Sequence, residues 1–281
     1  MSPQNLKLQD PESRNAPATE IATEFNTMPG FETQPQFAGT AEYSDTRLFA
    51  ILDDFLQSNN NNTETSHDSA VRSILRLVPD GVPLLQEVSN VGQVILEIAE
   101  QIPYYHPAHV KLARVLEEPS ISPKFMSGPG LNGLYQRSQR FDREREIRFE
   151  GNFSAFLAHV SSAHIGRHDP SDALMTMQNA LETPLDGETL ADRKLEIITA
   201  AQYILWDGQG LFKHALCPYP NDGRGDWKPG LLCIGEHGLT LERWRFWKKK
   251  FERITAGDSG VDEECREVSR KAVVLMDAIE E

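Results

Sequence analysis

Two histidines and two cysteines in the C-terminal half of the chain are residue types that bind zinc. His214 and Cys217 are separated by two residues, Cys233 and His237 by three, and fifteen residues lie between the two pairs. Two nitrogen and two sulfur ligands suit a tetrahedral zinc ion. However, the first pair reverses the order of the usual zinc finger, and Cys233 stands among aliphatic residues, as an ordinary buried thiol does. We therefore expect no cofactor, with a zinc-clipped loop as the alternative.

A second histidine set comprises His159, His164 and His168, which is followed by Asp169. His164 and His168 could share one helical face only if the helix ran through Gly166, which argues against it. Asp169 precedes a proline and is better explained as the N-cap of the next helix. This set therefore predicts neither a metal site nor an acid/base pair.

Motifs of known catalytic chemistry are absent from the sequence. It contains no Gly-x-Ser-x-Gly elbow and no His-Glu-x-x-His pair. The glycines at positions 128, 130 and 133 lack the lysine and hydroxyl of a phosphate-binding loop. Neighbouring acids such as Asp53 and Asp54 do not converge on one point. The sequence therefore leans away from an enzyme.

A cluster of basic residues near the C-terminus is the strongest candidate for a binding site in this acidic chain. Projected at about 100° per residue, Trp244, Trp247, Phe251 and Ile254 share one face of a helix, and the bases occupy the other. Phe246 falls among the bases, either as an exposed aromatic or packed on a neighbouring loop. The candidate site for an acidic partner is Arg243, Arg245, Phe246, Lys249, Lys250 and Arg253.

The alternative explanation of this cluster is internal. In an antiparallel helical hairpin, the bases at the end of the first helix approach the acids at the start of the second. Here the bases would be Lys249, Lys250 and Arg253, and the acids Asp262, Glu263, Glu264 and Glu267.

The elements that must position these residues are all predicted to be helices. Apolar residues recur at spacings of three and four from Ser44 onward, and no stretch alternates as a strand does. Ser44, Thr240 and Ser259 are expected N-caps, and Gly208 and Gly210 are expected to end a helix. The fold class is therefore all-α, an irregular multi-helix bundle of two coupled lobes.

The domain boundaries follow from changes in composition. Residues 1–42 hold five prolines and no apolar period, which predicts a disordered acidic tail. An N-terminal helical lobe is expected over 43–118, a connecting loop rich in glycine and mixed charge over 119–150, and a C-terminal lobe over 151–281. The last lobe is expected to end in an αα-hairpin.

Charge and cysteine content limit the possible environments. The net charge of −14 disfavours binding to nucleic acid or to an anionic membrane surface. Three cysteines do not make a disulfide framework, and no apolar run is long enough to span a membrane. We expect an intracellular protein, cytoplasmic or nuclear, with no transmembrane segment.

Four segments resemble a widespread family of uncharacterised fungal proteins, a domain of unknown function. They are 46–56, 102–116, 173–182 and above all 239–251, where Leu241, Glu242, Arg243, Trp244, Trp247 and Lys248 form a Leu-Glu-Arg-Trp-x-x-Trp-Lys pattern. The resemblance covers about residues 45–281 and departs from the family at His109. It implies a fungal source and a helical fold, with no established activity.

We conclude from the sequence that this is a non-catalytic interaction or accessory protein. The alternative is a small-molecule enzyme or binder with a pocket between the helical lobes, using Tyr104, His106 or His109 near their junction. The second alternative is the zinc-clipped form of either.

Overall fold

We describe a computed structural model of the chain. The described residues are 6–10, 43–58, 63–78, 85–121, 143–165, 170–184, 189–217, 227–257 and 260–281. Every regular element in these ranges is a helix, which confirms the all-α prediction. Most of the predicted tail and of the predicted connecting loop lies outside the described residues, as do His168, Asp169 and Ser259. None of the described helices is long and apolar enough to cross a membrane.

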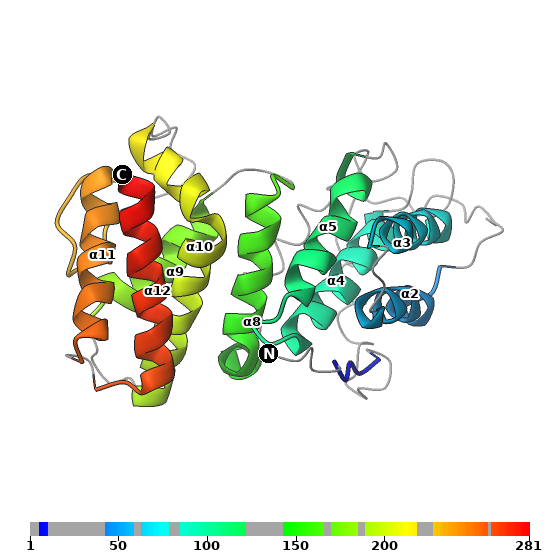
Figure 1. Ribbon diagram of the computed structural model, residues 1–281, viewed down its shortest axis with the longest axis horizontal. Helices are drawn as coiled ribbons and strands as arrows, with labels where there is room; N and C mark the ends of the chain where they lie inside the picture. Colours follow the sequence, from blue (N-terminus) through cyan, green and yellow to red (C-terminus); the bar gives the residue numbers. More distant parts are fainter. Residues whose placement is uncertain are drawn as a thin grey trace, which may run out of the picture.

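Four of the described helices share the core of the N-terminal lobe, at the right of Figure 1. Ser44 caps the first of them by accepting a hydrogen bond from the backbone N–H of Arg47, as predicted. The apolar stripes of these helices meet in one core, which includes Leu48, Ile74 and Ile95. The helices are α2 (Asp45–Gln57), α3 (Thr63–Leu77), α4 (Leu85–Gln101) and α5 (Ala108–Ile121).

The C-terminal lobe packs around a second core that contains Trp244, Trp247 and Phe251. Its last two helices lie side by side and antiparallel, so the predicted hairpin is present (Figure 1). The N-cap of the last helix is Asp262, whose side chain accepts from the N–H of Cys265. The helices are α9 (Ser171–Met177), the π-helix η2 (Gln178–Glu182), α10 (Leu190–Leu216), α11 (Leu241–Thr255) and α12 (Glu263–Glu280).

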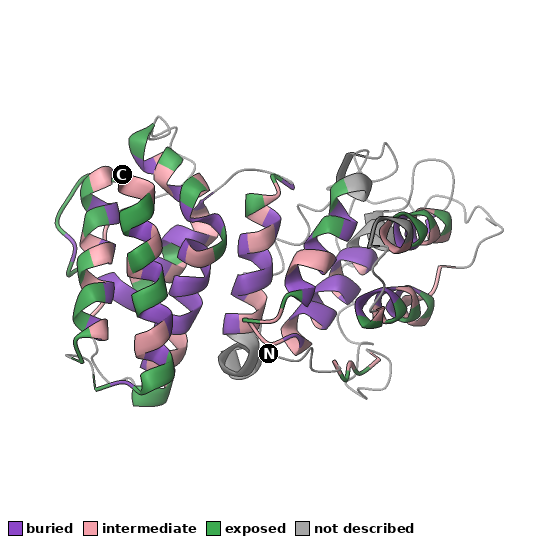
Figure 2. Cartoon of the chain, viewed as in Figure 1, coloured by how far each residue is buried: buried purple, intermediate pink, exposed green. Residues whose placement is uncertain are grey.

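One helix, α8 (Arg143–Ser162), stands between the two lobes and belongs to both. Phe156 and Val160 enter the N-terminal core, whereas Leu157 and Ala158 enter the C-terminal one. Figure 2 accordingly shows buried residues on both sides of this helix. The lobes are therefore coupled by a shared wall.

The start of α8 corrects the predicted connection over 119–150. Its last eight residues, 143–150, are helical, and α5 extends to Ile121 at the other end. The sequence Arg-Glu-Arg-Glu-Ile-Arg-Phe-Glu contains neither glycine nor proline, and it has opposite charges at spacings of three (Arg143 and Glu146) and four (Glu144 and Arg148), which favours a helix. Residues 143–150 thus belong to α8 and not to the connection.

Helix α10 does not end at Gly208 and Gly210, so that prediction was wrong. It continues to Leu216 through a kink at Asp207, where φ is −130° and ψ is 21°. A Cβ on residue 210 would lie 2.4 Å from Oδ1 of Asp207, and one on residue 208 would lie 3.1 Å from Ile279. The two glycines therefore allow close packing and do not terminate the helix.

A polar joint ties the turn between α4 and α5 to the C-terminal lobe. The Tyr104 hydroxyl donates to Oε1 of Glu264 at 2.9 Å. Lys194 Nζ lies 2.6 Å from carboxylate oxygens of both Asp262 and Glu264. Tyr104 N–H also donates to the Asn152 side chain of α8. Residues from α8, α10 and α12 thus converge on this turn.

Candidate functional site

Arg243 does not belong to the predicted surface site. Its side chain is 2% exposed, because it points into the C-terminal lobe beside the indole of Trp247. Helix α11 is positioned by Thr240, whose hydroxyl accepts from the N–H of Arg243 as predicted for an N-cap. The sequence interpretation, which placed all the bases on the outer face, was wrong for this residue.

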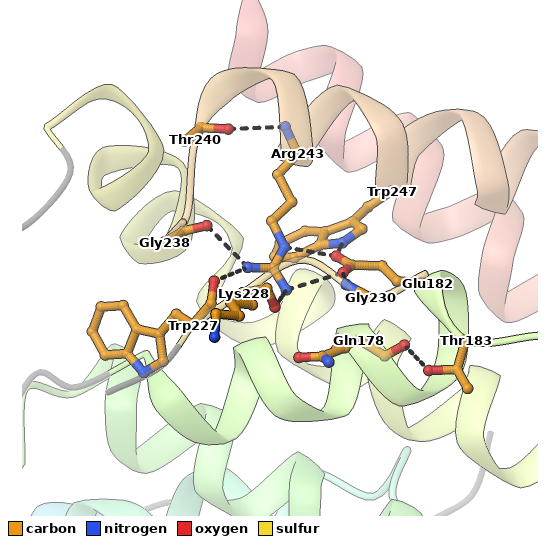
Figure 3. A network of polar contacts seen from close by, with 10 residues as sticks. All are labelled: Gln178, Glu182, Thr183, Trp227, Lys228, Gly230, Gly238, Thr240, Arg243 and Trp247. Atoms are coloured by element: carbon orange, nitrogen blue, oxygen red, sulfur yellow. Dashed lines mark hydrogen bonds and ion pairs between the residues drawn. The ribbon is translucent and has the colours of Figure 1, made fainter. Parts of the chain in front are cut away.

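Arg243 forms a buried ion pair with Glu182, the last residue of η2 (Figure 3). The guanidinium donates from Nε to Oε1 at 2.7 Å and from Nη2 to Oε2 at 3.0 Å, and the Glu182 side chain is 0% exposed. Oε1 also accepts from Trp247 Nε1 at 2.6 Å, and Oε2 accepts from the Gly230 N–H at 2.6 Å. Four donors therefore surround one buried carboxylate.

The same two side chains hold the loop that precedes α11. Arg243 Nη1 donates to the carbonyls of Trp227 and Gly238, and Nη2 reaches that of Lys228. The Glu182 carbonyl accepts from the Leu232 N–H at 2.8 Å. Residue 230 must be glycine, since a Cβ there would lie 2.7 Å from Cβ of Glu182. Loop 227–238 is thus fixed at several points along its length.

This fixed loop presents aliphatic side chains to solvent. Leu231 is 86% exposed and Ile234 is 97% exposed, while Leu232 is 42% exposed. Cys233 between them is buried, and burial raises the pKa of its thiol, as does the nearby Glu182. Exposed apolar side chains that gather in one patch mark a contact site more often than those scattered singly over a surface. We name Leu231, Leu232 and Ile234 the apolar tip.

Helix α11 has basic residues near this loop, of which Lys250 is close enough to act on the Cys233 thiol. Lys249 and Arg253 are exposed, and Lys250 Nζ is 5.2 Å from the centre of the Phe246 ring. Burial lowers the pKa of Lys250, as does the neighbouring charge of Arg253. Phe246 itself packs partly against the C-terminal core. Lys250 and Cys233 influence each other's titration, which places the base close to the apolar tip.

The acids that were expected to compensate these bases form ion pairs with other residues in the part of the chain that the structure describes. Lys194 forms ion pairs with Asp262 and Glu264, and bases of α12 itself form ion pairs with Glu263 and Glu267. The α11 residues that do form ion pairs with α12 contact its C-terminal end. They are Arg245, which contacts Glu280, and Lys248, which contacts Asp277 and Glu280. The acids at the start of α12 therefore leave Lys249 exposed without an ion pair among the described residues.

The four candidate zinc ligands all lie within the described residues. Cys217 is an exposed residue at the end of α10, whereas Cys233 is buried beside Glu182. Among the residues that the structure describes, no three His, Cys, Asp or Glu side chains gather closely enough to hold a metal ion. The structure does not bring His214, Cys217, Cys233 and His237 together as a zinc site.

A family model described as a protein of unknown function (DUF3632) matches residues 93–251, more than half of the chain. The chain belongs to the DUF3632 family. The matched region contains both partners of the buried ion pair and the apolar tip. Comparison with curated proteins and with solved structures gives no match.

The DUF3632 region also contains a cluster of titratable groups at the junction of the lobes. His159 of α8 stacks on Trp206 of α10 with ring centres 4.4 Å apart, and faces His109 of α5 at 6.3 Å. Burial lowers the pKa of His159 to about 4; burial and then His159 lower that of His109 to about 3. Burial thus holds both imidazoles neutral, although the hydrogen bond that His109 Nε2 donates to the Ile102 carbonyl by itself raises the pKa of His109.

The kink of α10 adds a carboxyl group to this junction. Asp207 is buried, and burial raises its pKa to about 6, against the opposing effects of the Ser161 hydrogen bond and His164. The Ser161 hydroxyl donates to Oδ2 at 2.5 Å. His164 lies at the turn after α8 with a φ of 58°. Of the second histidine set, His159 and His164 thus lie near the junction, and His168 lies outside the described residues.

Proposed function

We propose that this DUF3632 protein is a non-catalytic interaction protein that binds an acidic protein partner. Its contact surface consists of the apolar tip and the neighbouring bases Lys249, Lys250 and Arg253, with Phe246 between them and Arg245 at the edge. The observation that carries the proposal is the exposure of Leu231 and Ile234 on a loop that a buried ion pair holds in place. As part of the same proposal the partner is a protein of the fungal cytosol or nucleus, which the resemblance to fungal proteins supports.

The physical case rests on preorganisation and charge. A loop already fixed in its bound shape loses little conformational entropy when a partner covers it. Burying Leu231 and Ile234 contributes about 2 kcal/mol each. The exposed bases are a local exception in a chain of net charge −14, so they attract an acidic surface.

The test is affinity capture with Leu231→Ser plus Ile234→Ser, compared with the wild type by quantitative mass spectrometry. We expect the amount of captured partner to fall by roughly 100-fold or more, because two aliphatic side chains are then no longer buried on binding. Val274→Ser is the matched control, because Val274 is 63% exposed on the distant face of α12 and should leave capture unchanged. The charge reversal Lys249→Glu plus Arg253→Glu should lower the amount of captured partner. It should also make capture less sensitive to added salt, because salt screens the attraction that these bases contribute. The same proteins on every bait would refute the proposal.

A second candidate, a small polar ligand at the lobe junction, has one observation in its favour. His106 Nδ1 accepts from the Ala108 N–H, which leaves Nε2 as a donor, while His109 Nδ1 is an acceptor. Neither of these buried atoms has a hydrogen-bond partner among the described residues. A bound ligand should raise the Tm of the wild type by several degrees and that of His106→Phe by much less. Equal shifts in both proteins would place the ligand elsewhere.

A further inference from the structure

Residues 6–10 lie against the N-terminal lobe, below the ends of α2 and α4 (Figure 1, dark blue). They are the part of the predicted disordered tail, residues 1–42, that the structure describes. Leu6, Leu8 and Asp10 are partly buried, whereas Lys7 and Gln9 are exposed. An alternation with a period of two is the pattern of an extended chain with one side on a surface. Leu6 and Leu8 pack against the N-terminal core.

Two glutamine side chains of the lobe bind the main chain of this segment. Gln101, at the end of α4, accepts from the Gln9 N–H at 2.7 Å through Oε1 and donates to the Gln9 carbonyl at 3.2 Å through Nε2. Gln57, at the end of α2, donates to the Leu6 carbonyl. The Gln101 carboxamide therefore makes the pair of hydrogen bonds that a neighbouring β-strand would make.

These contacts are of the two kinds found in sites that bind extended peptides, namely hydrogen bonds to the main chain and apolar positions for alternate side chains. Hydrogen bonds to the main chain do not depend on the peptide's sequence, and alternate side chains entering apolar positions provide the selectivity. Here the selected pattern is Leu-x-Leu, since Leu6 and Leu8 face the body and Lys7 faces solvent. The segment is held weakly, because its leucines are only partly covered and each hydrogen bond adds about 1 kcal/mol.

We propose that the surface around Gln57 and Gln101 is a binding site for an extended Leu-x-Leu segment of a partner protein, and that residues 6–10 occupy it in cis as a competitor. A tethered segment acts at an effective concentration on the order of millimolar. A partner segment therefore binds only if its own affinity and concentration are high enough to displace residues 6–10. The site lies on the N-terminal lobe, away from the apolar tip, and does not depend on the acidic-partner surface.

The experiment uses the full-length chain with Leu6→Ser plus Leu8→Ser, which frees the site. A fluorescent peptide with the sequence of residues 3–12 is titrated to millimolar concentration and followed by anisotropy. We expect this variant to bind the peptide at least tenfold more tightly than the wild type, in which the cis segment competes. A peptide with serine in place of both leucines should not bind. Circular dichroism confirms that the helices are retained.

Two controls make the result specific to the glutamine contacts. Adding Gln101→Leu should weaken peptide binding by roughly 30-fold, as expected for two lost hydrogen bonds of about 1 kcal/mol each. Gln93→Leu, on the same helix but bonded to Glu97, should not. In the wild type, excess peptide should speed hydrogen exchange at the Gln9 amide. Equal binding by the wild type and the freed variant, or no binding by either, would overturn the proposal and leave residues 6–10 as a structural strap.

Discussion

Glu182→Gln should lower the free energy of unfolding by about 3–5 kcal/mol, the usual cost of removing one partner of a buried ion pair. The substitution leaves the Arg243 guanidinium without a counter-charge in a site that is closed to water. It also replaces one carboxylate oxygen, which accepts two hydrogen bonds, by an NH2 group, which can only donate. That NH2 group would face another donor, either Trp247 Nε1 or the Gly230 N–H. Urea denaturation followed by circular dichroism measures the loss.

Glu263→Gln is the matched control for that measurement. Glu263 also pairs with an arginine, but its side chain is 69% exposed, so its removal should cost no more than about 1 kcal/mol. Arg243→Met should cost as much as Glu182→Gln, and the double variant less than the sum of the two, because no unpaired charge then remains. If Glu182→Gln cost no more than Glu263→Gln, the ion pair would not be what holds the loop.

The same variant should loosen the loop before it unfolds the protein. Gly230 and Leu232 donate their N–H groups to Glu182, and three loop carbonyls accept from Arg243. Hydrogen exchange over 227–238 should therefore rise more than exchange in the core of α11. A uniform rise would mean that the loop and the helix open as one unit.

Much of the fold could be predicted because local chemistry decides it. The apolar residues of α11 and the caps at Ser44 and Thr240 follow from helical periodicity and from hydrogen-bonding needs at a helix start. The extension of α10 past Gly208 could not be predicted, since it depends on contacts with Ile279 and Asp207. Glycine alone does not distinguish a helix end from a close packing position.

The position of Arg243 could have been predicted, whereas that of Glu182 could not. Arg243 lies four residues before Trp247, only about 40° from it around the helix, and thus on the inward side. Its charge led us to group it with the surface bases. Glu182 pairs with a residue 61 positions away, and nothing near it in the sequence indicates that contact. Long-range pairing of this kind becomes visible only in the folded chain.

Acid should destabilise this protein through His109. The folded pKa of about 3 lies below the ordinary 6.5, because burial and the neighbouring His159 disfavour the charged form. Above pH 6.5 the imidazole is neutral in both states, so His109 adds no pH dependence. As the pH falls from 6.5 toward 3, the unfolded chain binds a proton that the folded chain does not, and stability falls by about 1.4 kcal/mol per pH unit.

His109→Gln isolates this contribution, since its amide can still donate to the Ile102 carbonyl but does not titrate here. Unfolding free energies of the wild type and the variant are compared at pH 7.5, 6.5 and 4.5. Their difference should be constant between the first two values and should shift by about 2–3 kcal/mol in favour of the variant at the third. Parallel losses in both proteins would show that His109 is not a source of acid sensitivity.

Asp207→Asn should change the pH dependence of stability in the opposite direction to His109→Gln. The pair of variants therefore tests the direction assigned to each pKa shift. The folded pKa of Asp207 is raised to about 6 by burial, so the folded chain binds a proton before the unfolded chain does. Asp207 therefore favours unfolding above pH 6 and loses that effect as the pH falls toward 3.8. Relative to the wild type, the asparagine variant should be most stable above pH 6 and lose that advantage at pH 4. The junction thus contains groups of opposite pH dependence, and the two buried imidazoles outweigh the single carboxyl.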